Sequence, residues 1–171
     1  ANMVALGMGT IQYSDITFTQ CKFRAINSGA GVGIRYAVHF PRALEYGSFT
    51  TTRCAMLATG GASENVGLLF GGVVNQGGEM RAVTWNTVDT NFTATSTHSM
   101  HYGLHMSGAT IRGTYDFLRC RFFAPGGHQS SAGIHWNAGW HGQVHTMSFT
   151  ACTFNSGRDG ARIRSGKFAS H

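Results

Sequence analysis

The chain has 171 residues, enough for a single domain over residues 1–171, which is either a whole protein or a piece of a longer one. Only 12% of the residues are charged against 42% hydrophobic, with 24 glycines and 2 prolines, which is typical of a turn-rich β protein. No apolar run approaches the roughly 18 residues of a membrane span, and the net charge of +6 favours an anionic partner or simply aids solubility.

Five related segments recur along the chain and are predicted to be strands, at 14–23, 47–56, 81–90, 113–122 and 145–154. The clearest copies read ITFTQCKF (16–23), YDFLRCRF (115–122) and MSFTACTF (147–154), with looser copies at 49–56 and 83–90. Their alignment gives steps of 32 to 34 residues and one shared column: Cys21, Cys54, Val88, Cys120 and Cys152. The flanking columns stay apolar, as expected when alternate side chains of stacked strands face a core.

A second strand series keeps the same period and is predicted at 31–36, 66–70, 101–106, 131–136 and 160–165. Its five copies contain, in order, GIRY (33–36), GLLF (67–70), GLHM (103–106), GIHW (133–136) and RIRS (162–165). Alternation places Ile34 and Tyr36 toward the core and Arg35 outward. Glycine-rich segments such as 57–65 and 123–131 read as loops. Two strands per period joined by loops describe one coil of an all-β solenoid.

The repeated phrase of strand, polar residue, Cys, any residue and Phe resembles the right-handed parallel β-helix of the pectate-lyase-like superfamily. The resemblance covers about five coils and nearly the whole chain, and it is most like a phage tailspike β-helix segment. It implies the architecture but not the activity, because this fold is shared by lyases, hydrolases, tailspikes and adhesins.

The four cysteines are predicted to be reduced thiols that fill the core. A metal site is disfavoured because no CxxC spacing exists and the cysteines have apolar neighbours. Disulfides are disfavoured because in-register side chains point the same way.

The outward column of the second series reads Arg35, Leu69, His105, His135 and Arg164. Four basic or potentially basic groups at the coil spacing match the repeating charges of an acidic polysaccharide, although a solvated sheet also accepts such residues. Aromatic residues near the loops (Trp136, Trp140 and Tyr102) offer surfaces on which sugars stack. We therefore take Arg35, His105, His135, Arg164, Trp136 and Trp140 as candidate ligand-binding residues.

Catalytic signals are weak. Glycosidases need two carboxyl groups within roughly 5 to 9.5 Å, and no two acids share a column on neighbouring coils. Glu64, Asp89 and Asp116 remain the candidates, with Asp89 also predicted to form a surface ion pair with Arg121. His135, His141 and His145 lie close in sequence but show no zinc motif. We expect no metal and no cofactor.

These observations favour a virion-associated or extracellular tailspike-like β-helix that binds anionic or neutral polysaccharide, with or without cleaving it. We expect no nucleic-acid partner and no membrane span. A homotrimer or larger assembly is expected because open sheet edges invite association. Two alternatives stay open: a polysaccharide lyase or glycoside hydrolase of the same fold, and a purely structural shaft or filament module.

Overall fold

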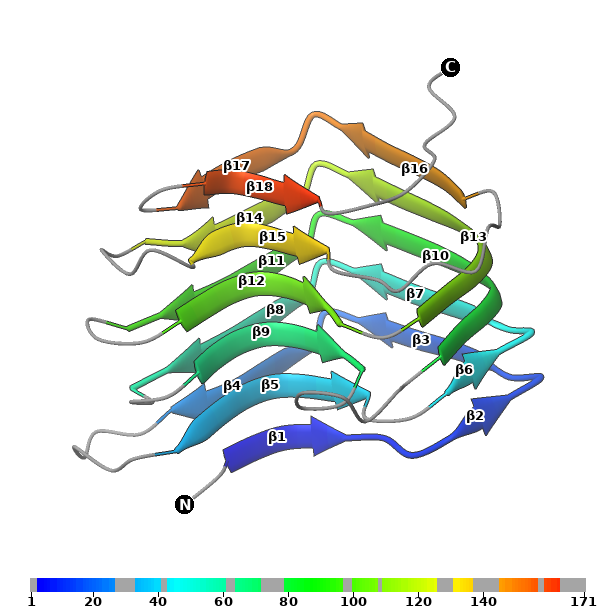
Figure 1. The fold of residues 1–171 in the computed structure, drawn as a ribbon, viewed down its shortest axis with the longest axis horizontal. Helices are drawn as coiled ribbons and strands as arrows, with labels where there is room; N and C mark the ends of the chain where they lie inside the picture. The colour runs from blue at the N-terminus through cyan, green and yellow to red at the C-terminus, as the bar shows by residue number, and fades with distance from the viewer. Residues whose placement is uncertain are drawn as a thin grey trace.

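The computed structural model describes residues 3–26, 33–40, 43–60, 64–71, 79–96, 100–107, 109–125, 131–136, 145–156 and 159–163. All regular structure in these residues is β-strand, and the strands stack in parallel as a β-solenoid (Figure 1). The predicted all-β solenoid is therefore confirmed.

Each coil contributes to three sheets, which we name A, B and C. Along the solenoid, sheet A contains β1 (Met3–Gly7), β5 (Ile34–Phe40), β9 (Glu64–Phe70), β12 (Met100–Met106), β15 (Ala132–Trp136) and β18 (Asp159–Ile163). Sheet B contains β2 (Ile11–Gln12) and β3 (Asp15–Thr19), β6 (Leu44–Glu45) and β7 (Ser48–Thr52), β10 (Glu79–Val88), β13 (Ala109–Leu118) and β16 (His145–Thr150). Sheet C contains β4 (Lys22–Ile26), β8 (Ala55–Thr59), β11 (Asn91–Thr95), β14 (Arg121–Ala124) and β17 (Thr153–Ser156).

The coil is right-handed, as the path from β5 in front through β7 to β8 behind shows in Figure 1. This is the hand that right-twisted strands favour for parallel crossovers. The solenoid makes about four turns, where the sequence predicts about five coils. Each period also contains three sheet segments rather than the predicted two strands.

The corner between sheets B and C explains why the sequence predicts one strand where the structure has two. In each described coil two residues separate the strands, and the first has a φ between 51° and 56°: Gln20, Arg53, Asp89, Arg119 and Ala151. This left-handed conformation turns the chain sharply. Each predicted strand of the first series, such as 14–23, is therefore two strands that meet at this corner.

The second corner residue lies in the column that the sequence assigns to the cysteines. Successive coils are joined there by backbone hydrogen bonds to the carbonyls of Cys21, Cys54, Thr90 and Cys120. The third coil thus places Thr90, and not Val88, in the column. Thr90 is fully buried, and its hydroxyl donates to the carbonyl of Val88 at 3.0 Å.

The cysteines are core thiols, as predicted. All four are free, with Cys54 and Cys120 buried and Cys21 and Cys152 partly buried in the end coils. The Cys54 thiol donates to the carbonyl of Phe18, 3.3 Å away on the preceding coil. Burial raises the pKa of the Cys120 thiol to about 12.

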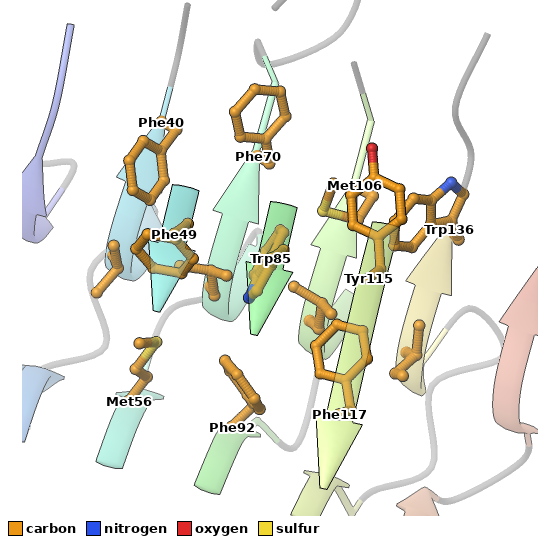
Figure 2. Packing of buried hydrophobic residues seen from close by; sticks show 14 of the residues in the cluster. Phe40, Phe49, Met56, Phe70, Trp85, Phe92, Met106, Tyr115, Phe117 and Trp136 are labelled. Carbon is orange, nitrogen blue, oxygen red and sulfur yellow. The ribbon is translucent and has the colours of Figure 1, made fainter. Parts of the chain in front are cut away.

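Aromatic side chains form continuous ladders inside the solenoid (Figure 2). The rings of Phe92 and Phe122 stack at 5.1 Å, and those of Phe122 and Phe154 at 5.2 Å. Trp85 is also enclosed, and its indole nitrogen donates a 2.7 Å hydrogen bond to Thr87. Buried rings supply much of the apolar area of such a core, and the satisfied indole avoids a desolvation penalty.

Sheet A bends at a column of small residues. A Cβ on Gly103 would meet backbone oxygens of Gly133 at 2.6 Å and Phe92 at 2.8 Å, so this position faces the interior. The next residue, Leu104, also lies in the main core. Because two successive residues face inward, the alternation of sides reverses at this point of the strand. Residues three apart, such as Tyr102 and His105, consequently meet on the outer face, with ring centroids 4.6 Å apart.

Candidate functional site

The outer face of sheet A carries ring side chains around one carboxylate, which we call the Glu64 cluster (Tyr36, Glu64, Tyr102, His105 and His135). Tyr36 donates a 2.9 Å hydrogen bond to one Glu64 oxygen, and Nδ1 of His105 lies 3.3 Å from the other. The rings of His105 and His135 stack at 4.8 Å, and Tyr102 lies 4.7 Å from His135. Four successive strands, β5, β9, β12 and β15, thus build one site.

Burial and charge act against each other at Glu64. Burial favours the neutral acid and is the largest single effect, but the hydrogen bond and charge of His105, with help from Tyr36 and His135, outweigh it and lower the pKa of Glu64. Burial, reinforced by the Glu64 charge, raises the pKa of Tyr36 far above its ordinary value. The cluster therefore holds a carboxylate and a neutral phenol side by side at neutral pH.

The cluster is largely enclosed but reaches the surface. About one seventh of the carboxylate and imidazole is open, with 15% of the Glu64 side chain and 14% of the His105 side chain exposed. An apolar patch of Val66, Leu69 and Ala132 packs with the two tyrosines, separately from the main core. The exposed parts of the cluster are therefore edges of His105 and Glu64, because Tyr36, Tyr102 and the ring nitrogens of His135 are buried.

The predicted outward direction of Arg35 is wrong. Arg35 is 2% exposed and donates a 2.9 Å hydrogen bond to the carbonyl of Ile34. It pairs in register with Asn65, which pairs with His101, and both of these are also buried. The physical reason is the reversal of alternation along sheet A, which turns this column inward and Tyr36 outward.

The basic row therefore contains different residues at its ends. The backbone register aligns His39, Leu69, His105, His135 and Arg162. The sequence alignment misses His39 by four positions, since AVHF and not GIRY matches GLHM. His105 and His135 keep their predicted outward places. His39 packs on Tyr36 with centroids 4.8 Å apart, and burial lowers its pKa.

Trp136 does not lie where a sugar could stack on it from outside. It is 3% exposed and packs in the main core against Tyr115, with ring centroids 4.9 Å apart (Figure 2). Tyr102 is also 3% exposed. Trp140 and Arg164 lie outside the described residues, so their predicted roles stay predictions.

The three candidate acids are not brought together. Asp89 lies at the B–C corner, where it makes a two-point ion pair with Arg119 at 2.7 and 2.8 Å, and not with the predicted partner Arg121. Hydrogen bonds from Arg119 lower the pKa of Asp89. Asp116 lies on the outer face of sheet B, in register with Asn86 and Ser148. Glu64 alone is joined to a histidine among the contacts of the described residues, and it begins β9 instead of lying in a loop.

Within the described part of the chain, no group of three histidine, cysteine or acidic side chains has the arrangement of a metal site. His141, one of the histidines considered for zinc, lies outside the described residues. The described segments also contain no helix with the length and apolar character needed to cross a membrane.

The Glu64 cluster is the place where titratable and aromatic groups of several coils converge on an outer face. Sequence reasoning found Glu64, His105 and His135 but did not connect them, and it missed Tyr36 and His39. The signal that could have connected them is the Gly67–Gly103–Gly133 column, which marks the bend. Comparison of the chain with protein-family models, curated proteins and solved structures finds no match in any of the three.

Proposed function

We propose that the chain is the β-helix of a tailspike-like, virion-associated or otherwise extracellular protein that binds surface polysaccharide. The single observation that carries this proposal is the Glu64 cluster, in which polar edges from successive coils line up on one outer face. Coils of a parallel solenoid repeat at about 4.8 Å, so a linear polymer lying along the axis meets similar groups again and again.

The cluster has the chemistry for sugar hydroxyls. Glu64 accepts hydrogen bonds, and the imidazole of His105 donates or accepts according to its tautomer. Both ring nitrogens of His135 are buried, so His135 contributes by stacking on His105. A positive charge on His105 would also attract the carboxylates of an acidic polysaccharide. The repeat of this sequence resembles that of the pectate-lyase-like β-helices. We include the chain among them as part of this proposal.

The test is retention of the purified chain in gels that contain single polysaccharides, some acidic and some neutral. We expect at least one polysaccharide to retard the wild type, and a His105→Ala/His135→Ala variant to lose about tenfold in affinity, the effect of removing one or two charged hydrogen bonds. Thr114→Ala, on the exposed face of sheet B, is the matched control and should bind normally. Equal retention of the histidine variant and the wild type would contradict the site.

Cleavage is the second candidate function, and the Glu64–His105 contact favours it. A carboxylate that fixes the orientation of an imidazole is a common arrangement of a general base. The same incubations should then yield new reducing ends or unsaturated ends, and these should disappear in Glu64→Gln. If the chain binds a polysaccharide but yields no products, its function is recognition alone. If it neither binds nor cleaves any polysaccharide, the structural shaft module is the function that is left.

We also propose a homotrimer or larger assembly, because among the described strands those at the ends of the stack pair on one side only and few residues are charged. Sedimentation equilibrium at micromolar concentration measures this directly. A single species with the 18.4 kDa mass of one chain would contradict it.

A further inference from the structure

Two tyrosines of neighbouring coils form an exposed stack at the start of sheet B. The rings of Tyr13 and Tyr46 are nearly parallel, 8° apart in tilt, with centroids at 5.1 Å. Tyr13 is 77% exposed and Tyr46 is 43% exposed, more than any other described large apolar side chain. Neighbouring exposed rings of this kind are one mark of a contact site for a partner.

The fold itself does not require aromatic rings at this position. Both tyrosines lie in the left-handed region, with φ of 50° and 53°, and the same column continues through Ala82 and Arg112 at 51° and 49°. The bend in the backbone is therefore a repeated feature of sheet B that alanine and arginine also adopt. The tyrosine rings are an addition to it, confined to the first two coils.

Polar groups flank the stack on both sides. Gln12 donates a 2.8 Å hydrogen bond to Glu45 on the next coil, in the residues just before the tyrosines. Just after them, Asp15 accepts hydrogen bonds from the hydroxyl of Ser48 at 2.7 Å and from its backbone N–H at 3.1 Å. All four side chains lie on the surface or partly exposed, and each carboxylate has an oxygen that these bonds leave available for a ligand.

We propose that Tyr13 and Tyr46 form a stacking platform for a pyranose ring of a neutral glycan. Because each tyrosine covers one face of the other, the apolar face of the sugar covers the outer face of one ring, while its equatorial hydroxyls donate to carboxylates at the edge of the platform. Glu45 and Asp15 occupy those edges. Their negative charge disfavours an acidic sugar at this place, in contrast to the histidines of the Glu64 cluster.

Farther along the same two coils, the outer face of sheet B continues with hydroxyls. Thr17 and Thr50 are in register, as are Thr19 and Thr52. Successive outward positions lie about 6.6 Å apart along a strand, so these hydroxyls lie within reach of sugar units that follow the stacked ring. The platform thus anchors one end of a short oligosaccharide, which runs along the strand direction.

This inference rests on the proposed function in that both take carbohydrate as the ligand, but it uses other residues, another sheet and another class of sugar. The experiment is affinity electrophoresis of the full chain in gels that contain soluble β-glucan, galactomannan or dextran, with a polyuronate as the acidic comparison. Tyr13→Ala, Tyr46→Ala and the double variant remove the rings, and Ala82 shows that the backbone accepts alanine there. Tyr13→Phe keeps the ring and is the matched control.

We expect at least one neutral glycan to retard the wild type, with about tenfold weaker binding by the double variant. Tyr13→Phe should bind within about twofold of the wild type, and 0.5 M salt should change the affinity little, because the contact involves no charge pairing. Circular dichroism and the unfolding midpoint of the double variant should match the wild type.

Two results would overturn the platform. The first is a wild type that no neutral glycan retards, and the second is a double variant that binds every retained glycan as the wild type does. If His105→Ala/His135→Ala abolishes binding while the tyrosine variants keep it, the platform fails and the proposed function stands. If only the tyrosine variants lose binding, the platform stands and the Glu64 cluster is not the glycan site.

Discussion

The hydroxyl of Tyr36 donates a 2.9 Å hydrogen bond to the carboxylate of Glu64 on the next coil of the solenoid. This bond joins β5 to β9 outside the backbone ladder and holds an ionised acid against a phenol in a partly buried place. It is a contact that depends on the protonation state of one group, and therefore on pH.

Acid should weaken the fold in two steps. Burial lowers the pKa of His39 from 6.5, so its contribution is present above that pH and is lost as the pH falls toward the folded-state pKa. The pKa of Glu64 is lowered from 4.5, so its contribution disappears below about pH 4.5. Urea unfolding between pH 3.5 and 8 measures both steps. Glu64→Gln should cost about 1 kcal/mol at pH 7 and remove the second step, while His39→Gln should remove the first. An unchanged pH profile in both variants would contradict this account.

Gly103→Ala should be strongly destabilising. The added methyl would lie 2.6 and 2.8 Å from backbone oxygens of two other strands, which cannot move aside without disrupting their ladders. We expect a loss of about 3 kcal/mol in the free energy of unfolding. Gly9→Ala is the control, since nothing lies within 4 Å of its added methyl, and its midpoint of urea unfolding should stay near that of the wild type. Equal midpoints for the two variants would show that sheet A does not approach sheet C so closely.

Ala151→Asn should stabilise the protein. Ala151 has a φ of 52° at an exposed B–C corner, and asparagine tolerates this left-handed conformation better than alanine. The expected gain is about 0.5 kcal/mol, seen as a higher midpoint in thermal unfolding. Thr153→Asn, two residues later in an extended strand, should give no such gain.

The cysteines should differ in reactivity. Cys54 and Cys120 are buried, and the raised pKa of Cys120 keeps its thiol protonated at ordinary pH. We predict that a thiol reagent at pH 8 modifies Cys21 and Cys152 first, while Cys54 and Cys120 react only as fast as the protein unfolds. Mass spectrometry of a time course distinguishes these sites. Rapid modification of Cys120 in the native protein would contradict its burial.

The solenoid was predictable because its signal is repeated many times. The same spacing of core positions recurs in most coils, as in Ile16, Phe18, Cys21 and Phe23. The period therefore remains recognisable even when one coil is aligned wrongly. The step of three between Phe18 and Cys21 even marks the B–C corner, because strict alternation requires steps of two. That step was available in the sequence and distinguishes three sheets from two.

Single side chains were less predictable, because each depends on one local departure from alternation. Arg35 precedes the bend marked by Gly67 and Gly103, so it lies on the opposite alternation from the outward residues that follow the bend. Thr90 can replace a cysteine in the core because its hydroxyl donates a hydrogen bond to the carbonyl of Val88. The polarity of threonine gives no sign of this buried position in the sequence. The contacts of the Glu64 cluster depend on the reversal of alternation along sheet A and on the four-residue change of register in β5, so the sequence supplied its members without their contacts.

The constant B–C corner has a consequence for how such a chain can vary. Two residues connect the sheets there in each described coil, whereas the segments that join β14 to β15 and β17 to β18 have different lengths, from Pro125 to Ser131 and from Gly157 to Arg158. Insertions are thus absorbed at one side of the coil without disturbing the ladders at the other. We expect a foreign peptide placed between Arg119 and Cys120, at this constant corner, to prevent folding. The B–C corner is thus the line along which the coils keep one length, whereas the connection from sheet C to sheet A varies in length from coil to coil.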